Sequence, residues 1–131
     1  MLKDFIRSSK AVSDETRVRI LNLLRHNELC VCQLMAILGM GQSTVSKHLG
    51  ILKNAGLIEP QKRGTWSFYR LSKDNVNRHN LDFMSILASL PKDDPFIMKD
   101  ENKLKKVSDK DIAFCNTLGL SRRLGERSSN V

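Results

Sequence analysis

Two cysteines that are one residue apart, Cys30 and Cys32, offer the clearest chemistry in this sequence. They lie in the stretch ELCVCQL, close before the segment QSTVSKHLG. Thiolates are soft ligands that favour thiophilic ions, and the start of a helix lowers the pKa of a thiol. The pair therefore predicts a site for a soft metal or metalloid. Simple packing stays open, because cysteine often serves as a small buried hydrophobic residue.

The spacing of the two cysteines sets a condition on the backbone. On an ideal helix, residues i and i+2 lie about 200° apart, so their sulfurs would point to opposite sides. Joint binding of one ion by Cys30 and Cys32 therefore requires non-helical backbone around Val31, or an unwound first helical turn.

The elements that must position these thiols follow from hydrophobic periodicity and local stop signals. Asp14 is expected to cap a helix, and Gly39, Gly41 and Gly56 to interrupt or end helices. Two strands reverse at Arg63 and Gly64, with Pro60 restricting the first strand to a sheet edge. The expected helices are 2–10, 15–26, 31–38, 42–55 and 75–90, and the expected strands are 57–62 and 65–71. This order predicts a mainly α fold with a small β-hairpin, namely a winged helix-turn-helix.

The charge distribution agrees with a nucleic-acid partner. The chain has 131 residues and a net charge of +8, and residues 42–73 hold six basic residues against one acidic residue. The second helix of the motif would enter the major groove, and the hairpin tip would meet the DNA backbone or minor groove. The residues expected at DNA are Gln42, Ser43, Ser46 and Lys47 on that helix, with Lys62 and Arg63 on the hairpin.

The rest of the sequence indicates how the chain is divided and which other classes of function it excludes. The stretch LDFMSILASL is apolar on more than one face, which predicts burial against a second subunit. We expect residues 1–90 to form the DNA-binding and dimerisation domain, residues 91–110 a charged flexible linker, and residues 111–131 a short helical segment and a disordered tail. The sequence has no apolar run of about 18 residues, no signal-peptide core, no phosphate loop and no paired catalytic acids. A cytoplasmic protein that is neither an enzyme nor bound to a membrane is expected.

The motifs DETRVRILNLL, ELCVCQL, QSTVSKHLGILKNAGLI and KRGTWSFYRL resemble the ArsR/SmtB family of winged-helix metal-sensing repressors over about residues 10–90. The resemblance implies a homodimer that binds a palindromic operator and is released by a metal or metalloid. It also implies DNA contacts at Gln42, Ser43, Ser46 and Lys47, with His48 nearby. Cys30 and Cys32 match the CVC motif of the arsenic- and cadmium-responsive branches.

The resemblance leaves the third ligand open. Arsenic-branch members often carry another cysteine three residues after the second one, where this chain has Met35, so Cys115 is the remaining candidate. The favoured function is a repressor released by trivalent arsenic or antimony, with no organic cofactor. The alternatives are a cadmium- or lead-responsive repressor, a thiol-redox-responsive repressor, and a constitutive DNA-binding protein with structural cysteines.

Overall fold

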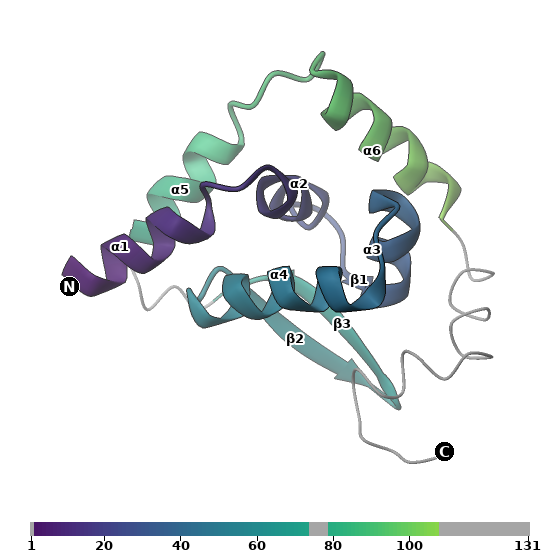
Figure 1. The fold of residues 1–131 in the computed structure, drawn as a ribbon, viewed down its shortest axis with the longest axis horizontal. Coiled ribbons are helices and arrows are strands. Elements are labelled where there is room, and N and C mark those ends of the chain that lie inside the picture. The colour runs from purple at the N-terminus through teal and green to yellow at the C-terminus, as the bar shows by residue number, and fades with distance from the viewer. Residues whose placement is uncertain (1, 74–78, 108–131) are drawn as a thin grey trace.

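The chain folds into helices around a small antiparallel sheet (Figure 1). The computed structural model describes residues 2–73 and 79–107. In order, its elements are α1 (Leu2–Ala11), α2 (Glu15–Leu23), β1 (Leu29–Cys30), α3 (Val31–Leu38), α4 (Gln42–Asn54), β2 (Ile58–Arg63), β3 (Trp66–Leu71), α5 (His79–Leu87) and α6 (Pro95–Lys106). The predicted winged helix-turn-helix is confirmed, with α3 and α4 as its two helices and β2–β3 as its wing.

Local signals explain where the helices of the motif begin and end. The Asp14 carboxylate accepts a hydrogen bond from the Arg17 amide at 3.1 Å, as expected of an N-cap. Gly39 ends α3 with a φ of 67°, and Gly56 follows α4 with a φ of 76°. Both values lie in the left-handed region that glycine adopts without a steric penalty. Gly39 therefore specifies the turn between α3 and α4, and Gly56 specifies the end of α4.

Within the described residues, the sheet has three strands in the order β1-β3-β2, with β3 in the centre. The hairpin pairs Ile58 with Leu71 at one end and Arg63 with Trp66 at the other. Pro60 lies on the edge strand β2, as predicted. The sequence did not predict β1, which pairs Leu29 with Tyr69 and Cys30 with Phe68. A cysteine of the CVC motif therefore belongs to the same sheet as the wing.

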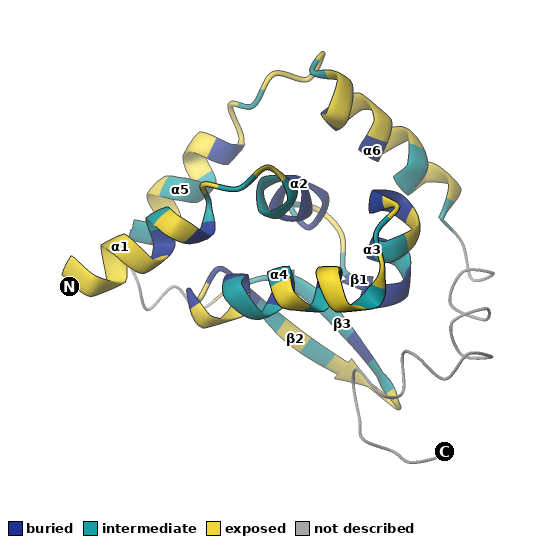
Figure 2. Cartoon of the chain, viewed as in Figure 1, coloured by how far each residue is buried: buried dark blue, intermediate teal, exposed yellow. Residues whose placement is uncertain are grey.

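The core fills the space between α2, α3, α4 and the base of the sheet (Figure 2). Val45, Leu49 and Leu52 form the predicted buried face of α4. Leu87 of α5 is also buried, whereas Leu81 and Ile86 of the same helix are exposed. Helix α5 lies beside α1, where the Phe5 ring meets His79 edge-on at 5.2 Å. The predicted residues 75–78 of this helix lie outside the described residues.

Residues 95–106 form a docked helix, so the prediction of a flexible linker is wrong for this segment. Helix α6 lies across α2 and α3 (Figure 1). Arg19 of α2 donates two hydrogen bonds to Asp100, each 2.8 Å long, and the Asp100 side chain is buried. Ile97, three residues before Asp100 on α6, is also buried. A charge-rich helix can dock here because one buried carboxylate has a matched guanidinium partner.

Candidate DNA-binding surface and thiol site

Helix α4 presents its polar face outward. Ser43 and Lys47 are exposed and Gln42 is half-buried at the first turn, so three of the predicted DNA-contacting residues lie on one accessible side. Gly41 precedes the helix with extended backbone and provides no side-chain cap. The free amides at the start of α4 are therefore open to an anion such as a DNA phosphate.

Ser46 does not share this outward orientation. Its residue is half-buried, and its hydroxyl oxygen is buried without a hydrogen-bond partner among the described residues. In this conformation the hydroxyl cannot reach DNA. Ser46 therefore remains a predicted DNA contact only if its side chain changes rotamer.

His48 faces α2 and not the solvent side of α4. Its Nδ1 atom lies 3.2 Å from Nη1 of Arg17 and 4.0 Å from the Asp14 carboxylate. Because a guanidinium can only donate, Nδ1 must accept and the neutral ring carries its proton on Nε2. Burial lowers the pKa of His48; the Asp14 charge opposes this shift, and the charges of Arg17 and Lys47 reinforce it. This position favours a structural role for His48 over the predicted role near DNA.

Arg17 joins three elements through the same side chain. It donates from Nε to the carbonyl oxygen of Ala11 at 2.8 Å and from Nη2 to that of Lys10 at 3.1 Å. These carbonyl groups belong to the end of α1, where the helix itself provides no amide partners. The Lys10 carbonyl also accepts from the amide and the hydroxyl of Ser13. Arg17 therefore holds the end of α1 and the side of α4 at the start of α2.

The wing places its basic residues as predicted. Lys62 and Arg63 are exposed, one strand position apart, and Gly64 makes the turn with a φ of 65°. The guanidinium carbon of Arg63 lies 5.3 Å from the centre of the Phe68 ring, so its charge rests over an aromatic face. Arg63 also donates to the Glu28 carboxylate.

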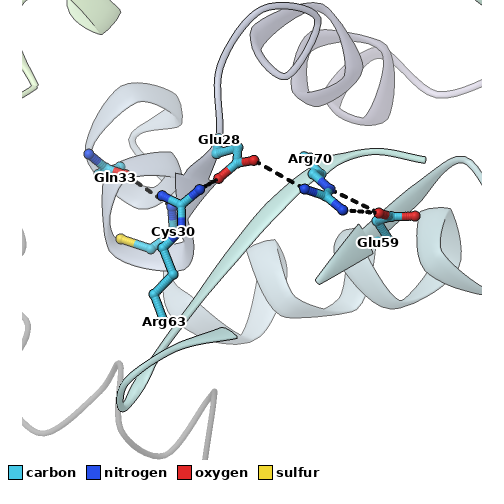
Figure 3. A network of polar contacts seen from close by, with 6 residues as sticks. All are labelled: Glu28, Cys30, Gln33, Glu59, Arg63 and Arg70. Atoms are coloured by element: carbon cyan, nitrogen blue, oxygen red, sulfur yellow. Dashed lines mark hydrogen bonds and ion pairs between the residues drawn. The ribbon is translucent and has the colours of Figure 1, made fainter. Parts of the chain in front are cut away.

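A network of charged residues connects Glu28 with both strands of the wing (Figure 3). Arg70 donates from Nε to Glu59 at 2.8 Å, and its Nη2 atom lies 2.7 Å from the same carboxylate oxygen. Its Nη1 atom lies 3.5 Å from Glu28. Glu59 therefore holds Arg70 tightly, while Glu28 has Arg63 as its stronger partner. No sequence pattern selects Glu28, because its partners are 35 and 42 residues away.

The two cysteines of the CVC motif meet at the junction of strand and helix. Cys30 ends β1 and precedes α3 with extended backbone, at a φ of −88° and a ψ of 169°. Cys32 is the second residue of α3, and both side chains pack with Phe68 in one cluster. Because Cys30 is not helical, the 200° separation does not apply, and the predicted non-helical backbone is present. The Cys30 amide donates to Oε1 of Gln33 at 3.0 Å, which fixes the helix start.

The described residues contain two cysteines but no complete metal site. Cys30 is not in a disulfide, whereas Cys32 is disulfide-bonded, so Cys32 becomes a soft thiolate ligand only after reduction. Cys30 and Cys32 are 1% and 2% exposed, so an ion can reach them only if this junction opens. Within residues 2–73 and 79–107, no group of three His, Cys, Asp or Glu side chains could hold a metal ion. The predicted third ligand, Cys115, lies outside the described residues. In the same part of the chain, no helix has the length and apolarity needed to cross a membrane.

The fold and the basic surface define a winged-helix DNA-binding protein. Residues 14–59 match the family model of the bacterial regulatory proteins of the arsR family. The chain is 38% identical over 78 residues to the arsenical resistance operon repressor of Bacillus subtilis, covering 59% of this chain and 74% of that protein. It is also 38% identical over 76 residues to a cadmium resistance regulatory protein homolog of Staphylococcus aureus, covering 57% of this chain and 63% of that protein.

A solved structure gives the same assignment. The homodimeric winged helix-turn-helix DNA-binding domain of a possible ArsR-family regulator from Mycobacterium bovis is 29% identical, with a TM-score of 0.57. The match covers 72% of this chain and 87% of that one. The chain therefore belongs to the arsR family of DNA-binding transcriptional regulators. Its relatives differ in the effector that their names record, so family membership does not identify the effector of this chain.

Proposed function

We propose that this regulator is a repressor released from operator DNA when trivalent arsenic or antimony binds Cys30 and Cys32. The observation that supports this proposal is the single buried cluster of both cysteines with Phe68 of the wing. An ion bound at this cluster would contact strand β1 and helix α3, which lie next to the wing and to the DNA-binding helix α4. Binding there can therefore be coupled to a loss of DNA affinity.

The ligand types suit the proposed effector. Once Cys32 is reduced, the two thiolates can hold a thiophilic trivalent species, and no carboxylate or imidazole among the described residues completes a group that would suit a harder ion. Cys115 would provide the third sulfur for arsenite. A monomethylated trivalent arsenical offers only two positions and would need only Cys30 and Cys32.

We further propose that the repressor acts in the cytoplasm as a homodimer formed through α1 and α5. These adjacent helices expose large apolar side chains, namely Leu2, Phe5, Ile6, Leu81 and Ile86. An apolar surface of this kind is typical of an interface between subunits. Two copies would then present two α4 helices to the half-sites of a palindromic operator.

The test is operator release measured by fluorescence anisotropy under reducing conditions, with a duplex selected from a random-sequence library. Arsenite, methylarsenite, cadmium and a polysulfide are titrated separately. Cys30→Ala and Cys32→Ala are preferable to serine variants, because serine would bury a hydroxyl without an assured partner. Cys115→Ala is the matched third variant.

We expect arsenite to release the wild-type protein and neither Cys30→Ala nor Cys32→Ala. Cys115→Ala should respond less to arsenite than wild type does, and normally to methylarsenite. Release by cadmium alone would establish the cadmium alternative, and release by polysulfide alone the redox alternative. Normal arsenite release of both CVC variants would show that these cysteines are structural.

A further inference from the structure

Glu28 connects the strand that carries Cys30 with the tip of the wing. It lies two residues before Cys30, directly before β1, and its carboxylate accepts from Arg63 (Figure 3). Arg63 is one of the two basic residues that would meet DNA. The same guanidinium that DNA would use is therefore already occupied by a carboxylate of the protein.

The second contact of Arg63 leads to the same place. Its guanidinium lies over Phe68, and Phe68 packs against Cys30 and Cys32. In the sheet, Phe68 is also the register partner of Cys30. A displacement of β1 would therefore move both groups that hold Arg63, namely the carboxylate before the strand and the ring beside it.

A carboxylate and a DNA phosphate compete for the same donors. Arg63 presents a planar fork whose N–H groups fit either anion, so a phosphate must replace or share the contact with Glu28. Arg70 is in a different situation, because Glu59 holds it through both Nε and Nη2. Loss of the Glu28 charge would release Arg63 and leave Arg70 anchored.

We infer that Glu28 is an intramolecular competitor of operator phosphate for Arg63, and that it transmits the state of the Cys30–Cys32 cluster to the wing. The competition requires only that Arg63 contacts DNA. The transmission rests on the proposed effector role of the cysteines. Glu28 itself contacts neither the DNA nor the effector in this scheme and acts by positioning Arg63.

The first test is the Glu28→Gln variant of the full chain, which preserves the shape of the side chain and removes its charge. Operator affinity without effector should rise about two- to fivefold, the range expected for releasing one partly exposed ion pair. Glu59→Gln is the matched control. It removes the same charge from the same network, but Glu59 does not contact Arg63. It should change the affinity less than Glu28→Gln does.

A double-mutant cycle with Arg63→Ala separates this inference from a general charge effect. Arg63→Ala alone should weaken binding and reduce the salt slope by about one unit. In that background, Glu28→Gln should have no effect. If the Glu28→Gln gain persists without Arg63, or if Glu59→Gln gives the same gain, the competition is refuted. An Arg63→Ala variant with normal affinity and slope would instead refute the wing contact on which it rests.

The transmission is tested with sodium arsenite on Glu28→Gln. Arsenite binding, followed by ultraviolet absorbance of the sulfur–arsenic bonds, should match wild type. The factor by which arsenite weakens operator binding should be smaller than in wild type. Equal binding with an unchanged factor would overturn the transmission, whereas failure of wild type to bind arsenite would overturn the proposed effector.

Discussion

Replacing Asp100 with asparagine should detach or strongly destabilise α6. The Asp100 side chain is 1% exposed, and both of its oxygens accept from Arg19 at 2.8 Å. The pair is held under Phe96, whose ring centre lies 5.1 Å from the guanidinium carbon of Arg19. Asparagine fits the same space, but it leaves the Arg19 charge without a matching carboxylate.

The magnitude follows from the burial of the pair. Removal of one partner from a buried ion pair costs about 3–5 kcal/mol, because the remaining charge is desolvated and uncompensated. Arg19 keeps slight exposure, and α6 can separate locally and rehydrate it. We therefore expect a loss near the lower limit, about 3 kcal/mol in the free energy of unfolding. The pKa of Arg19 is raised by its hydrogen bonds to Asp100, so this guanidinium stays charged at neutral pH.

Urea unfolding at fixed protein concentration measures this loss, and amide hydrogen exchange locates it. Asp4→Asn is the control, because Asp4 pairs with Arg7 at 3.6 Å on the surface. Such an exposed pair contributes about 0–1 kcal/mol. The double variant Arg19→Met/Asp100→Leu should recover most of the stability, since an apolar pair of similar volume can replace a buried ion pair. If Asp100→Asn unfolds like Asp4→Asn, the docking of α6 does not depend on this pair.

Three further predictions concern DNA binding, assembly and pH. Lys47→Ala should weaken operator binding and reduce the salt slope by about one unit, whereas Lys99→Ala on α6 should change neither; equal effects would refute the α4 assignment. Ile86 is 63% exposed on α5, so Ile86→Glu should give a monomer by sedimentation, and an intact dimer would exclude this interface. Burial lowers the pKa of His48, so its stabilising contribution is present above about pH 6.5 and is lost as the pH falls below that value. The free energy of unfolding, measured with urea, should therefore decrease more between pH 7.5 and pH 5.5 in wild type than in His48→Gln. Identical decreases would refute this assignment.

The helix-turn-helix could be predicted from sequence because its signals are local. The apolar spacing of α4, the carboxylate cap at Asp14 and the glycines at 39 and 56 each act within a few residues of the boundary they determine. Helix α3 begins and ends at the predicted residues for the same reason. Apart from the linker over residues 95–106, which is a helix, the division of the chain into domains stays a prediction.

The missed elements depend on contacts between residues far apart in the sequence. Strand β1 has two residues and exists only because β3 pairs with it. Helix α6 has a local signal that could have been used, because Asp94 caps it and Pro95 occupies its first position. Its docking has no such signal, since Arg19 and Asp100 are 81 residues apart.

The orientation of His48 could have been read from the helical pattern. His48 is three residues after Val45 and four before Leu52, so it adjoins the buried stripe of α4. Only the family resemblance implies that His48 lies near the DNA. The inward turn of the Ser46 hydroxyl, in contrast, is a choice of side-chain rotamer that no sequence pattern determines.

The energetics of the contacts around the cysteines indicate whether an effector would first move helix α4 or the tip of the wing. Helix α4 is held by Val45, Leu49 and Leu52, which are fully or almost fully buried, and displacement of a packed core helix costs several kcal/mol. The wing tip is held at Glu28 by an ion pair that is partly exposed and contributes only about 0–1 kcal/mol. A deformation at Cys30 therefore meets less resistance along β1 toward Arg63 than through α3 toward α4. For this reason, arsenite should weaken contacts of the wing before those of α4, and footprinting during a titration should show protection lost first where the hairpin tip meets the DNA. Simultaneous loss across the whole operator would instead indicate that α3 and α4 move as one unit.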